Sequence, residues 1–548
     1  MGSTGKKPYF GMTGFMLNVW VSVACTTAMT LFGYDQGVFG GIIITDNFLE
    51  TMGNPDADLQ GTIVSLYDIG CFFGAMATFL FGEYFGRRKT FIIGIIVMSI
   101  GAVLQTTAFG VAHMIVARLI TGLGNGINTA TAPVWQSETS KASMRGKLIV
   151  FSMIMNIAGF SLSNWMTYGF SFLSGSISWR FPIAFQLVFS VILICTVPWL
   201  PESPRWLLAH GYEEEGVIVL VALEGGSATA KDPKIVDQKL EILEAVRIEQ
   251  ETSPSWSDIF HGRTGDTGMI QRLLLGAGTQ WMQQLVGINV TSYYLPLVLQ
   301  NSVGLSNTLA RLLAACNSVS YLVFSFAGLV LIERAGRRKL MMWGAAGQCV
   351  CYILIAGLLS QADGSERGSR FGAGATTFFF VYYLFFGICW QGVPWLYPVE
   401  INSLAMRTKG AALATGSNWI SNYIVVQATP PGIQNLGWKF YLIWMTFNAM
   451  FVPLVWLLYP ETANRHLEDI DKLYRENKSM VFVVGNKEAV QTERPERFVE
   501  ADRERERLAM MEQEGNGSHG LDEERRGNLK GQNLKGDEEE VEHVEDRS

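Results

Sequence analysis

The chain has 548 residues, of which 49% are hydrophobic and only 17% are charged. This charge content is low for a soluble protein, and the apolar residues gather into segments of about 20 residues, the length that spans a bilayer. The net charge of −7 arises from residues 481–548, which carry 19 Asp/Glu and 11 Lys/Arg, so no basic surface indicates binding to nucleic acid.

Twelve apolar segments predict an all-α membrane protein with twelve transmembrane helices, because helices satisfy their backbone hydrogen bonds within lipid. The seven cysteines all lie in these segments without a CxxC pair, so we predict no disulfide framework, and we expect neither a metal site nor a cofactor. The first segment is too long for the h-region of a cleavable signal peptide. The segments are residues 17–40, 61–82, 90–109, 112–135, 148–169, 181–200, 271–300, 308–332, 340–360, 374–399, 408–428 and 436–459.

The loops between these segments differ in positive charge. The loop at 41–60 carries acidic residues and neither Lys nor Arg. Because Lys and Arg accumulate on the cytoplasmic side of membranes, we place the basic loops in the cytoplasm, and an even number of spans places both termini there too. The basic residues are Arg87, Arg88 and Lys89; Lys141, Arg145 and Lys147; Arg334, Arg337, Arg338 and Lys339; Arg407 and Lys409; and Lys6 and Lys7 near the N-terminus.

Two acidic residues lie inside predicted spans, where a charge is costly and usually functional. Asp35 is in the first span, and Arg118 in the fourth span offers it a basic partner. Gly122 and Gly126 free the Arg118 face of side-chain bulk, so another helix can approach closely. The paired carboxylate can take up a proton, whereas the arginine retains its own. A static buried ion pair is the alternative, and Asp68 in the second span is either a second functional acid or a local contact.

The seventh span contains four carboxamides and two adjacent tyrosines with no charge among them. Helical spacing places the glutamines and Gly287 on one face. Asn289 reaches the same side only if the helix loosens near Gly287, as broken transporter helices do. Because carboxamides donate and accept hydrogen bonds, they suit a neutral polyhydroxylated ligand; contacts between helices are the alternative. The residues are Gln280, Gln283, Gln284, Asn289, Tyr293 and Tyr294, and we expect the two tyrosines to gate the site.

Three short motifs each occur twice, in the same order, with the second copy 250–262 residues after the first. This order predicts two parallel six-helix halves. The first copies are Glu83 with Arg87 and Arg88, Glu138 with Arg145, and Pro201 with Glu202; the second copies are Glu333 with Arg337 and Arg338, Glu400 with Arg407, and Pro460 with Glu461.

Over residues 15–475 the chain resembles the sugar porter family of the major facilitator superfamily, and it is most similar to the fungal monosaccharide transporters of that family. The resemblance implies twelve helices, alternating access and a central sugar site. It also implies that the Glu and Arg residues of the first two motif pairs form ion pairs between helices that latch the outward-facing state.

Position by position, the resemblance assigns sugar contacts to residues of the seventh, tenth and eleventh spans. An aromatic face stacks on the C–H face of a pyranose, while amides bind its hydroxyl groups. Proton-coupled members carry Asp in the first-span motif and uniporters carry Asn, so Asp35 and Arg118 match the coupled members. The assigned sugar contacts are Gln280, Gln283, Gln284, Asn289, Trp395, Asn418 and Asn422.

The chain also departs from the family pattern. The expected fifth-span glutamine is Met153, and the expected eighth-span asparagine is Tyr321, with Asn317 one turn earlier on the same face. The Gly-Pro before Val-Pro-Trp in the tenth span reads Gln391-Gly392. We expect Tyr321 and Gln391 to contact the substrate, which leaves a hexose, a pentose or a polyol open.

We therefore expect a cytoplasmic N-terminus at 1–16, a six-helix half at 17–200, cytoplasmic linker helices at 201–270, a second half at 271–460, and a cytoplasmic tail at 461–548 that is largely disordered after about 480. The function predicted is plasma-membrane import of a monosaccharide with a proton, by a protein that acts as a monomer in the lipid bilayer. A facilitative uniporter and a transporter-like sugar sensor are the alternatives. An enzyme is not expected, because no catalytic constellation stands out.

Overall fold

The computed structural model describes residues 8–140, 142–226, 228–252, 256–261, 268–362, 365–403, 406–465, 467–477, 479, 481–500, 503–504 and 507. The chain divides into two compact units, Met1–Thr492 and Glu493–Ser548. All the regular elements of the described residues are helices, and the long ones belong to the first unit.

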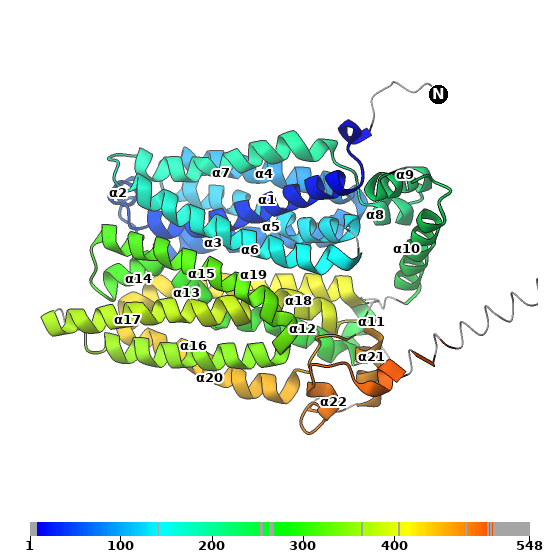
Figure 1. Cartoon of the computed structure of the whole chain (residues 1–548). Helices are drawn as coiled ribbons and strands as arrows, with labels where there is room; N and C mark the ends of the chain where they lie inside the picture. Colours follow the sequence, from blue (N-terminus) through cyan, green and yellow to red (C-terminus); the bar gives the residue numbers. More distant parts are fainter. Residues whose placement is uncertain are drawn as a thin grey trace, which may run out of the picture. The chain divides into compact units, whose positions relative to one another are not determined.

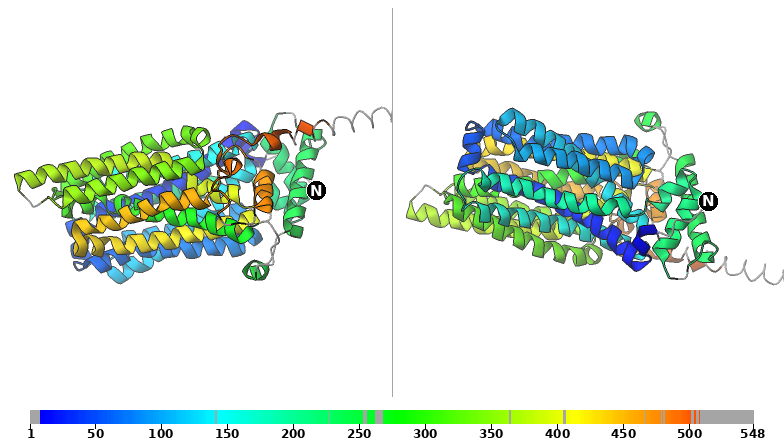
Figure 2. Two further views of the ribbon diagram at one scale, coloured as in Figure 1. Left: turned by 90° about the horizontal axis from the view of Figure 1, so that it is seen from below. Right: turned by 90° about the horizontal axis from the view of Figure 1, so that it is seen from above.

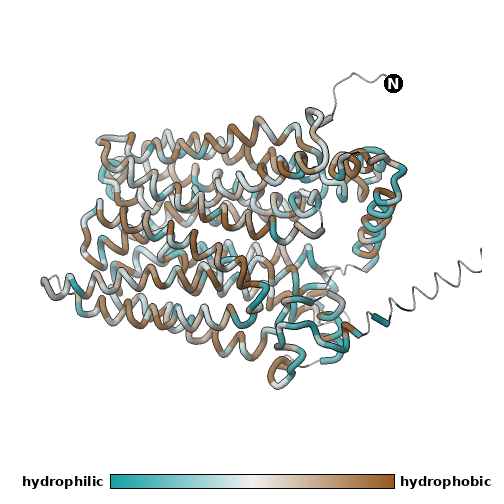
Figure 3. Tube along the Cα trace, viewed as in Figure 1, coloured by the Kyte–Doolittle hydropathy of each residue, from teal (hydrophilic) through white to brown (hydrophobic). Residues whose placement is uncertain are grey.

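The first half of the bundle consists of six long helices that run side by side (Figure 1). A short helix, α2 (Asp46–Thr51), follows the first of them at one end of the bundle, which we call the α2 end. Apolar residues dominate these helices along their length (Figure 3). The six helices are α1 (Phe15–Ile42), α3 (Ala57–Phe85), α4 (Arg87–Thr106), α5 (Val111–Thr139), α6 (Ala142–Phe170) and α7 (Ile177–Thr196).

The second half contains six further spans, and two of them are interrupted. The seventh span consists of α12 (Met269–Leu285), α13 (Ile288–Ser292) and α14 (Leu295–Asn301). The tenth consists of α17 (Glu366–Phe385), the π-helical turn η3 (Phe386–Trp390) and α18 (Val393–Ile401). The unbroken spans are α15 (Asn307–Ala335), α16 (Arg337–Leu359), α19 (Arg407–Leu436) and α20 (Phe440–Leu458).

The prediction of twelve membrane helices in two halves is confirmed. By length and hydropathy alone, nine stretches of the described residues qualify as spans, and one of them, Arg407–Leu458, contains both α19 and α20. Neither α5 nor the broken seventh span is among the nine. These are the helices in which the arginine and the carboxamides identified in the sequence replace apolar residues.

Glycines allow α3 and α5 to approach closely beside Arg118, as the sequence predicts. A Cβ atom on Gly122 would lie 2.1 Å from the carbonyl oxygen of Tyr67, and one on Gly126 would lie 2.1 Å from that of Cys71. Real Cβ atoms do not approach a backbone oxygen so closely, so these two positions require glycine.

The segment between the halves folds into four helices at the end of the bundle opposite α2, which we call the linker end (Figures 1 and 2). The start of α1 is tied to this segment, because Nδ2 of Asn18 donates to the carbonyl oxygen of Leu223 at 2.9 Å. The helices are α8 (Pro204–Ala209), α9 (Glu213–Glu224), α10 (Pro233–Thr252) and α11 (Trp256–Phe260).

Part of the C-terminal segment is folded within the first unit. This part contains α21 (Leu467–Glu476), and residues 481–492, which include α22 (Lys487–Val490), also belong to the first unit. Val483 and Ala489 are fully buried. The backbone N–H of Glu461 donates to the carbonyl oxygen of Ala489 at 2.8 Å. The apolar run 481–484 supplies buried side chains to the fold. The average composition of the tail is charged, so it does not reveal this short run. Residues 508–548 lie outside the described part of the chain.

Candidate functional site

A cavity lies between the two halves, near the middle of the bundle. Its walls combine carboxamides with aromatic and aliphatic side chains. Residues of α1 and α6 line it from the first half, and residues of the seventh, eighth, tenth and eleventh spans line it from the second half. The lining residues are Phe32, Gln36, Met153, Asn156, Ile157, Phe160, Gln283, Gln284, Ile288, Asn289, Ser292, Tyr293, Tyr321, Phe386, Gln391, Trp395 and Asn418.

The break in the seventh span brings Asn289 to this cavity. The helix ends at Leu285, and Gly287 adopts a φ of +92°, a left-handed conformation that favours glycine. The hydroxyl group of Tyr352 donates to the Gly287 carbonyl oxygen at 3.0 Å, which satisfies one backbone group freed by the break. Beyond the break, Nδ2 of Asn289 donates to Oε1 of Gln284. The predicted loosening at Gly287 is therefore confirmed.

Gln280 supports the cavity wall without lining it. Its Nε2 donates to the carbonyl oxygen of Pro394 at 2.7 Å, and its Oε1 accepts from Nδ2 of Asn418 at 2.6 Å. The same Asn418 nitrogen donates to Oε1 of Gln283 at 3.2 Å. Gln283 also donates to the carbonyl oxygen of Trp390 at 2.9 Å. One amide network thus holds the seventh, tenth and eleventh spans together behind the cavity.

Asn422 also lies behind the wall. Its Oδ1 accepts from Nδ2 of Asn289, and its own Nδ2 donates to Oδ1 of Asp68 at 3.0 Å. Of the nine predicted substrate contacts, the structure therefore places seven at the cavity and two, Gln280 and Asn422, one residue behind it. The cavity is also lined by three polar residues that the sequence analysis did not identify, Gln36, Asn156 and Ser292. Of these, Gln36 could have been identified, because it follows Asp35 directly in the sequence.

The two tyrosines predicted to gate the site separate in the structure. Tyr293 lines the cavity, and its carbonyl oxygen lies 2.7 Å from where a Cβ atom on Gly40 would be, so the seventh span touches α1 here. Tyr294 is buried away from the cavity and donates through its hydroxyl group to the carbonyl oxygen of Val426 at 3.1 Å. The placement of Tyr294 gives it a contact between helices and no direct access to the site.

Asp35 and Arg118 form the predicted pair. Nη1 of Arg118 lies 3.5 Å from Oδ2 of Asp35, and both side chains are fully buried. The guanidinium carbon lies 4.1 Å from the ring centroid of Phe39 and 4.4 Å from that of Tyr67, and Nη2 donates to the carbonyl oxygen of Val64 at 3.0 Å. Aromatic faces and a carbonyl thus share the stabilisation of this cation with the carboxylate. Oδ1 of Asp35 has no hydrogen-bond partner among the described residues.

Contacts between the halves close the α2 end. Nη2 of Arg311 on α15 donates to the carbonyl oxygen of Gly41 at 3.1 Å and to the hydroxyl oxygen of Thr45 at 2.8 Å. The hydroxyl group of Ser65 on α3 donates to Oε1 of Gln427 on α19 at 2.7 Å. These hydrogen bonds would have to break for the cavity to open toward the α2 end.

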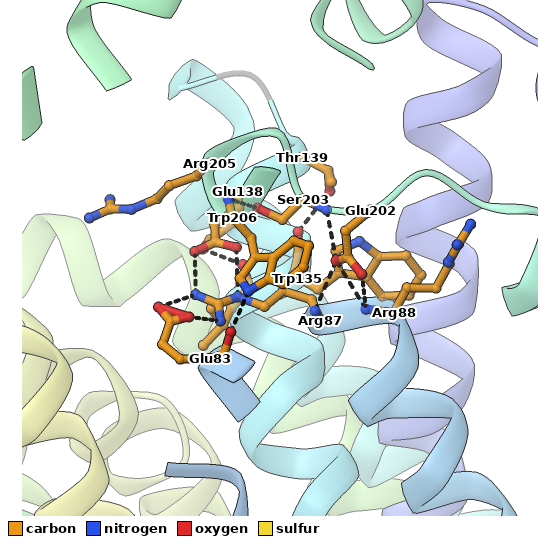
Figure 4. A network of polar contacts seen from close by, with 12 residues as sticks. Glu83, Arg87, Arg88, Trp135, Glu138, Thr139, Glu202, Ser203, Arg205 and Trp206 are labelled. Atoms are coloured by element: carbon orange, nitrogen blue, oxygen red, sulfur yellow. Dashed lines mark hydrogen bonds and ion pairs between the residues drawn. The ribbon is translucent and has the colours of Figure 1, made fainter. Parts of the chain in front are cut away.

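The charged motifs lie at the linker end. In the first half, Arg87 contacts both Glu83 and Glu138, the latter at 3.0 Å (Figure 4). Glu202 accepts from the backbone N–H groups of Arg87 at 2.9 Å and of Arg88 at 3.1 Å. Burial raises the pKa of the Glu202 carboxyl group, although these N–H groups and that of Ser203 act in the opposite direction.

The second half repeats this cluster. Arg337 contacts Glu333 at 3.1 Å and Glu400 at 2.6 Å. Glu461 accepts from the backbone N–H groups of Arg337 at 2.8 Å and of Arg338 at 3.2 Å. Each cluster joins helices within one half. The repeated geometry gives Glu202 and Glu461 the same role, a role for which the recurring Pro-Glu motif was the sequence signal.

Two residues assigned to the ion pairs make other contacts. The side chain of Arg88 donates to the carbonyl oxygen of Leu200 at 3.0 Å, and that of Arg338 donates to the carbonyl oxygen of Trp456 at 2.8 Å. Arg407 is the first residue of α19, and the side chain of Arg145 lies outside the described part of the chain.

Comparisons with known proteins agree with this architecture. Residues 20–474 match the family model described as "Sugar (and other) transporter". The chain is 53% identical to the MFS-type transporter oryC of Aspergillus oryzae, covering 91% of this chain and 93% of that protein. It is 34% identical to the sugar transporter STL1 of Saccharomyces cerevisiae, covering 86% and 83%, respectively.

Solved structures show the same fold. The proton:xylose symporter XylE bound to 6-bromo-6-deoxy-D-glucose superposes with a TM-score of 0.69 at 24% identity, covering 84% of this chain and 99% of that one. A partially occluded inward open conformation of the xylose transporter XylE from E. coli gives a TM-score of 0.69 at 22% identity, covering 82% and 99%, respectively.

Proposed function

Because this chain belongs to the sugar porter family of the major facilitator superfamily, we propose that it imports a monosaccharide by proton symport through alternating access. The chain is a multi-pass membrane transporter, and the monosaccharide substrate, the proton coupling and the orientation in the membrane are what we propose. The observation that carries the proposal is the cavity between the halves, with amides on one part of its wall and aromatic and aliphatic groups on another.

The chemistry of this wall suits a sugar ring. Gln283, Gln284 and Asn289 offer amide groups that bind hydroxyl groups as donors and acceptors. Trp395 and Phe32 offer aromatic faces for the apolar C–H face of the ring. The hydrogen bonds behind the wall hold the amides in place, so little conformational entropy is lost when a ligand binds.

Coupling to protons would use Asp35. When ionised, this carboxylate pairs with Arg118, which cannot give up its own proton. When protonated, it loses most of its attraction to the guanidinium group, which loosens the link between α1 and α5. In the proposed cycle, proton and sugar enter from outside and the halves rock. Both then leave inside, and the ionised Asp35 pairs again with Arg118 during the return.

The orientation follows from charge. The basic loops lie at the linker end, which we assign to the cytoplasm together with both termini, and we propose the plasma membrane as the location. The closed contacts of Arg311 and Ser65 would then lie on the extracellular side. In the opposite, outward-facing state, the charged clusters at the linker end would hold the cytoplasmic side closed. We propose that one chain suffices for transport, because the cavity is formed entirely by this chain.

Uptake measurements test the proposal. Radiolabelled glucose and xylose would be supplied to cells that lack their own carriers, with other hexoses, pentoses and polyols as competitors. We expect saturable uptake with accumulation against a gradient. Saturable uptake without accumulation would identify a uniporter, and absence of uptake of every compound by surface-expressed protein would contradict the transport of sugar and favour a sensor.

A further inference from the structure

The mechanism proposed above does not use Asp68, a buried acid within the second span. Asp68 on α3 is fully buried, and no ion pair involves it among the described residues. Its Oδ1 accepts from the neutral amide of Asn422, while its Oδ2 has no hydrogen-bond partner in the described part of the chain. Burying an ionised carboxylate without a neighbouring cation costs free energy. The presence of Asp68 at this depth therefore points to a functional role.

Among the described residues, Arg118 is the one cation that interacts with both Asp35 and Asp68. The titratable or charged groups that interact with Asp68 are Asp35 on α1, Arg118 on α5, Cys71 on its own helix, and Tyr293 and Tyr294 of the seventh span. Thiol and phenol groups ordinarily stay neutral below about pH 8. With both acids ionised, the group would therefore hold two anions and one cation, and the cation pairs with Asp35.

A chain of amides leads from Asp68 to the cavity. Nδ2 of Asn422 donates to Asp68, Oδ1 of Asn422 accepts from Asn289, and Asn289 donates in turn to Oε1 of Gln284. Asn289 and Gln284 both line the cavity. The bonds from Asn289 to Asn422 and from Asn422 to Asp68 run toward the carboxylate, because an ionised Asp68 only accepts hydrogen bonds, and the same Asn289 nitrogen also donates to Gln284.

We propose that Asp68 is a second protonation site, and that its protonation reverses the hydrogen bonds from Asn422 through Asn289 to Gln284. One proton from solvent forms an O–H bond on Oδ1 of Asp68, and no other covalent bond changes. That hydroxyl group then donates to Oδ1 of Asn422 after the Asn422 amide turns over. Asn289 turns in response, because two amide nitrogens cannot form a hydrogen bond with each other. Its oxygen then faces Oε1 of Gln284, and Gln284 turns because two amide oxygens cannot form one either.

The reversal of these hydrogen bonds changes the groups that the proposed sugar site offers to a ligand. The reversal exchanges the amide oxygen and nitrogen that Asn289 and Gln284 present to the cavity, so a ligand hydroxyl group meets a donor in one state and an acceptor in the other. This inference rests on the proposed function and gives the site a proton-dependent affinity that is separate from the Asp35–Arg118 pair. Coupling between two sites in one protein typically changes affinity about 5- to 150-fold.

Equilibrium binding tests the proposal. The dissociation constants of radiolabelled D-xylose and D-glucose would be measured on the purified full-length protein from about pH 5 to pH 8. We expect the wild-type constant to change by about fivefold or more over this range. Asp68→Asn, which cannot ionise, should bind with a smaller change in affinity over this range than the wild type, and the change that remains belongs to Asp35. Asn422→Leu should lose the same part of the pH dependence, because the chain of amides is interrupted although Asp68 still titrates.

Ser65→Ala is the matched control. Ser65 lies on the same helix as Asp68 and bonds to α19 through Gln427, but neither residue lines the cavity. This variant should retain the wild-type pH dependence. A wild-type affinity that does not vary with pH, an Asp68→Asn variant that keeps the full wild-type variation, or a Ser65→Ala variant that loses part of it would each overturn the proposal.

Infrared difference spectroscopy between acid and neutral pH gives a second readout that needs no sugar. Of the carbonyl stretches of protonated carboxyl groups in the wild type, one should be missing in Asp68→Asn, where that of Asp35 remains, and the same band should be retained at a shifted frequency in Asn422→Leu. An unchanged band in Asp68→Asn would overturn the proposal even if binding could not be measured. If neither sugar binds but the band behaves as expected, the choice of sugar in the proposed function fails while the protonation of Asp68 stands.

Discussion

The hydroxyl group of Tyr321 donates a hydrogen bond to Oε1 of Gln391, and both side chains line the central cavity. These are two of the positions at which the chain departs from the pattern of its family. Asn317, the asparagine one turn earlier, is buried outside the cavity and accepts from Ser320 at 3.2 Å. These two departures therefore form one paired change in the wall, which a further departure, Met153, also lines. We propose the pair as the candidate for setting substrate preference.

Tyr321→Asn should shift the ratio of hexose to pentose uptake. Asparagine is smaller than tyrosine, and it offers a carboxamide where tyrosine offers one hydroxyl group. Tyr321→Phe keeps the ring and removes only the hydroxyl group, so it separates size from hydrogen bonding. Combining Tyr321→Asn with Gln391→Gly should give a non-additive effect, because the two residues are in contact. Equal preference ratios in all variants would show that this pair does not select the substrate.

Trp395→Ala should weaken sugar binding by about 1–3 kcal/mol, because an aromatic face that covers the ring is removed. Surface expression should persist, since the side chain borders a cavity. Trp456→Ala is the control: Trp456 lies on α20, does not line the cavity and is 49% exposed. The measurement is the concentration dependence of initial uptake, and an unchanged half-saturation concentration in Trp395→Ala would place the site elsewhere.

Gly287→Ala should destabilise the protein by about 1–3 kcal/mol, because alanine is strained at a φ of +92°. Its Cβ would also lie 2.3 Å from the hydroxyl oxygen of Tyr352. Gly357→Ala is the control, since a Cβ there meets nothing within 4 Å. Thermal unfolding of the purified proteins checks this expectation, which a Gly287→Ala variant as stable as Gly357→Ala would contradict.

Two truncations should separate the folded and the charged parts of the tail. Ending the chain at Thr492 removes only the second unit and should leave uptake and thermal stability unchanged. Ending it at Asn477 removes the carbonyl oxygens of Glu488 and Gln491, to which Arg465 donates, and the buried Val483. Stability should therefore fall in the shorter protein. Equal unfolding temperatures for both truncations would show that residues 478–492 add nothing to the fold.

Asp35→Asn should uncouple sugar from proton movement. The amide resembles a protonated carboxyl group but cannot ionise, so sugar exchange should survive while accumulation is lost. Arg118 is then left without its anion, and an unpaired buried charge costs several kcal/mol, so expression must be measured alongside. Arg118→Ala should instead impair proton release, because the cation that favours ionised Asp35 is gone.

Sugar-induced alkalinisation of an unbuffered cell suspension is the readout for both variants. Asp35→Asn cells should show none. If they alkalinise the medium as strongly as wild-type cells, Asp35 is not the coupling site, and Asp68 becomes the principal candidate. If the wild type itself gives no alkalinisation, the protein is a uniporter.

Much of the architecture was determined by the sequence alone. Segments of about 20 apolar residues cross a bilayer as helices wherever they occur, so the span count required no tertiary information. The repeated Glu, Gly and Arg motifs located the two halves. The buried pair of Asp35 and Arg118 was predictable because an isolated charge within lipid needs a partner, and few basic residues lie at that depth.

Only the tertiary structure decided which polar residues face the cavity. Gln280, Gln283 and Asn422 are all buried amides, yet of the three only Gln283 lines the wall. Gln280 and Asn422 instead bond to groups on neighbouring helices behind it. The contact of Tyr321 with Gln391 and the chain from Asp68 to Gln284 join spans far apart in sequence. Helical periodicity fixes the face on which a residue lies within its own helix, whereas the neighbour it meets depends on how the helices pack.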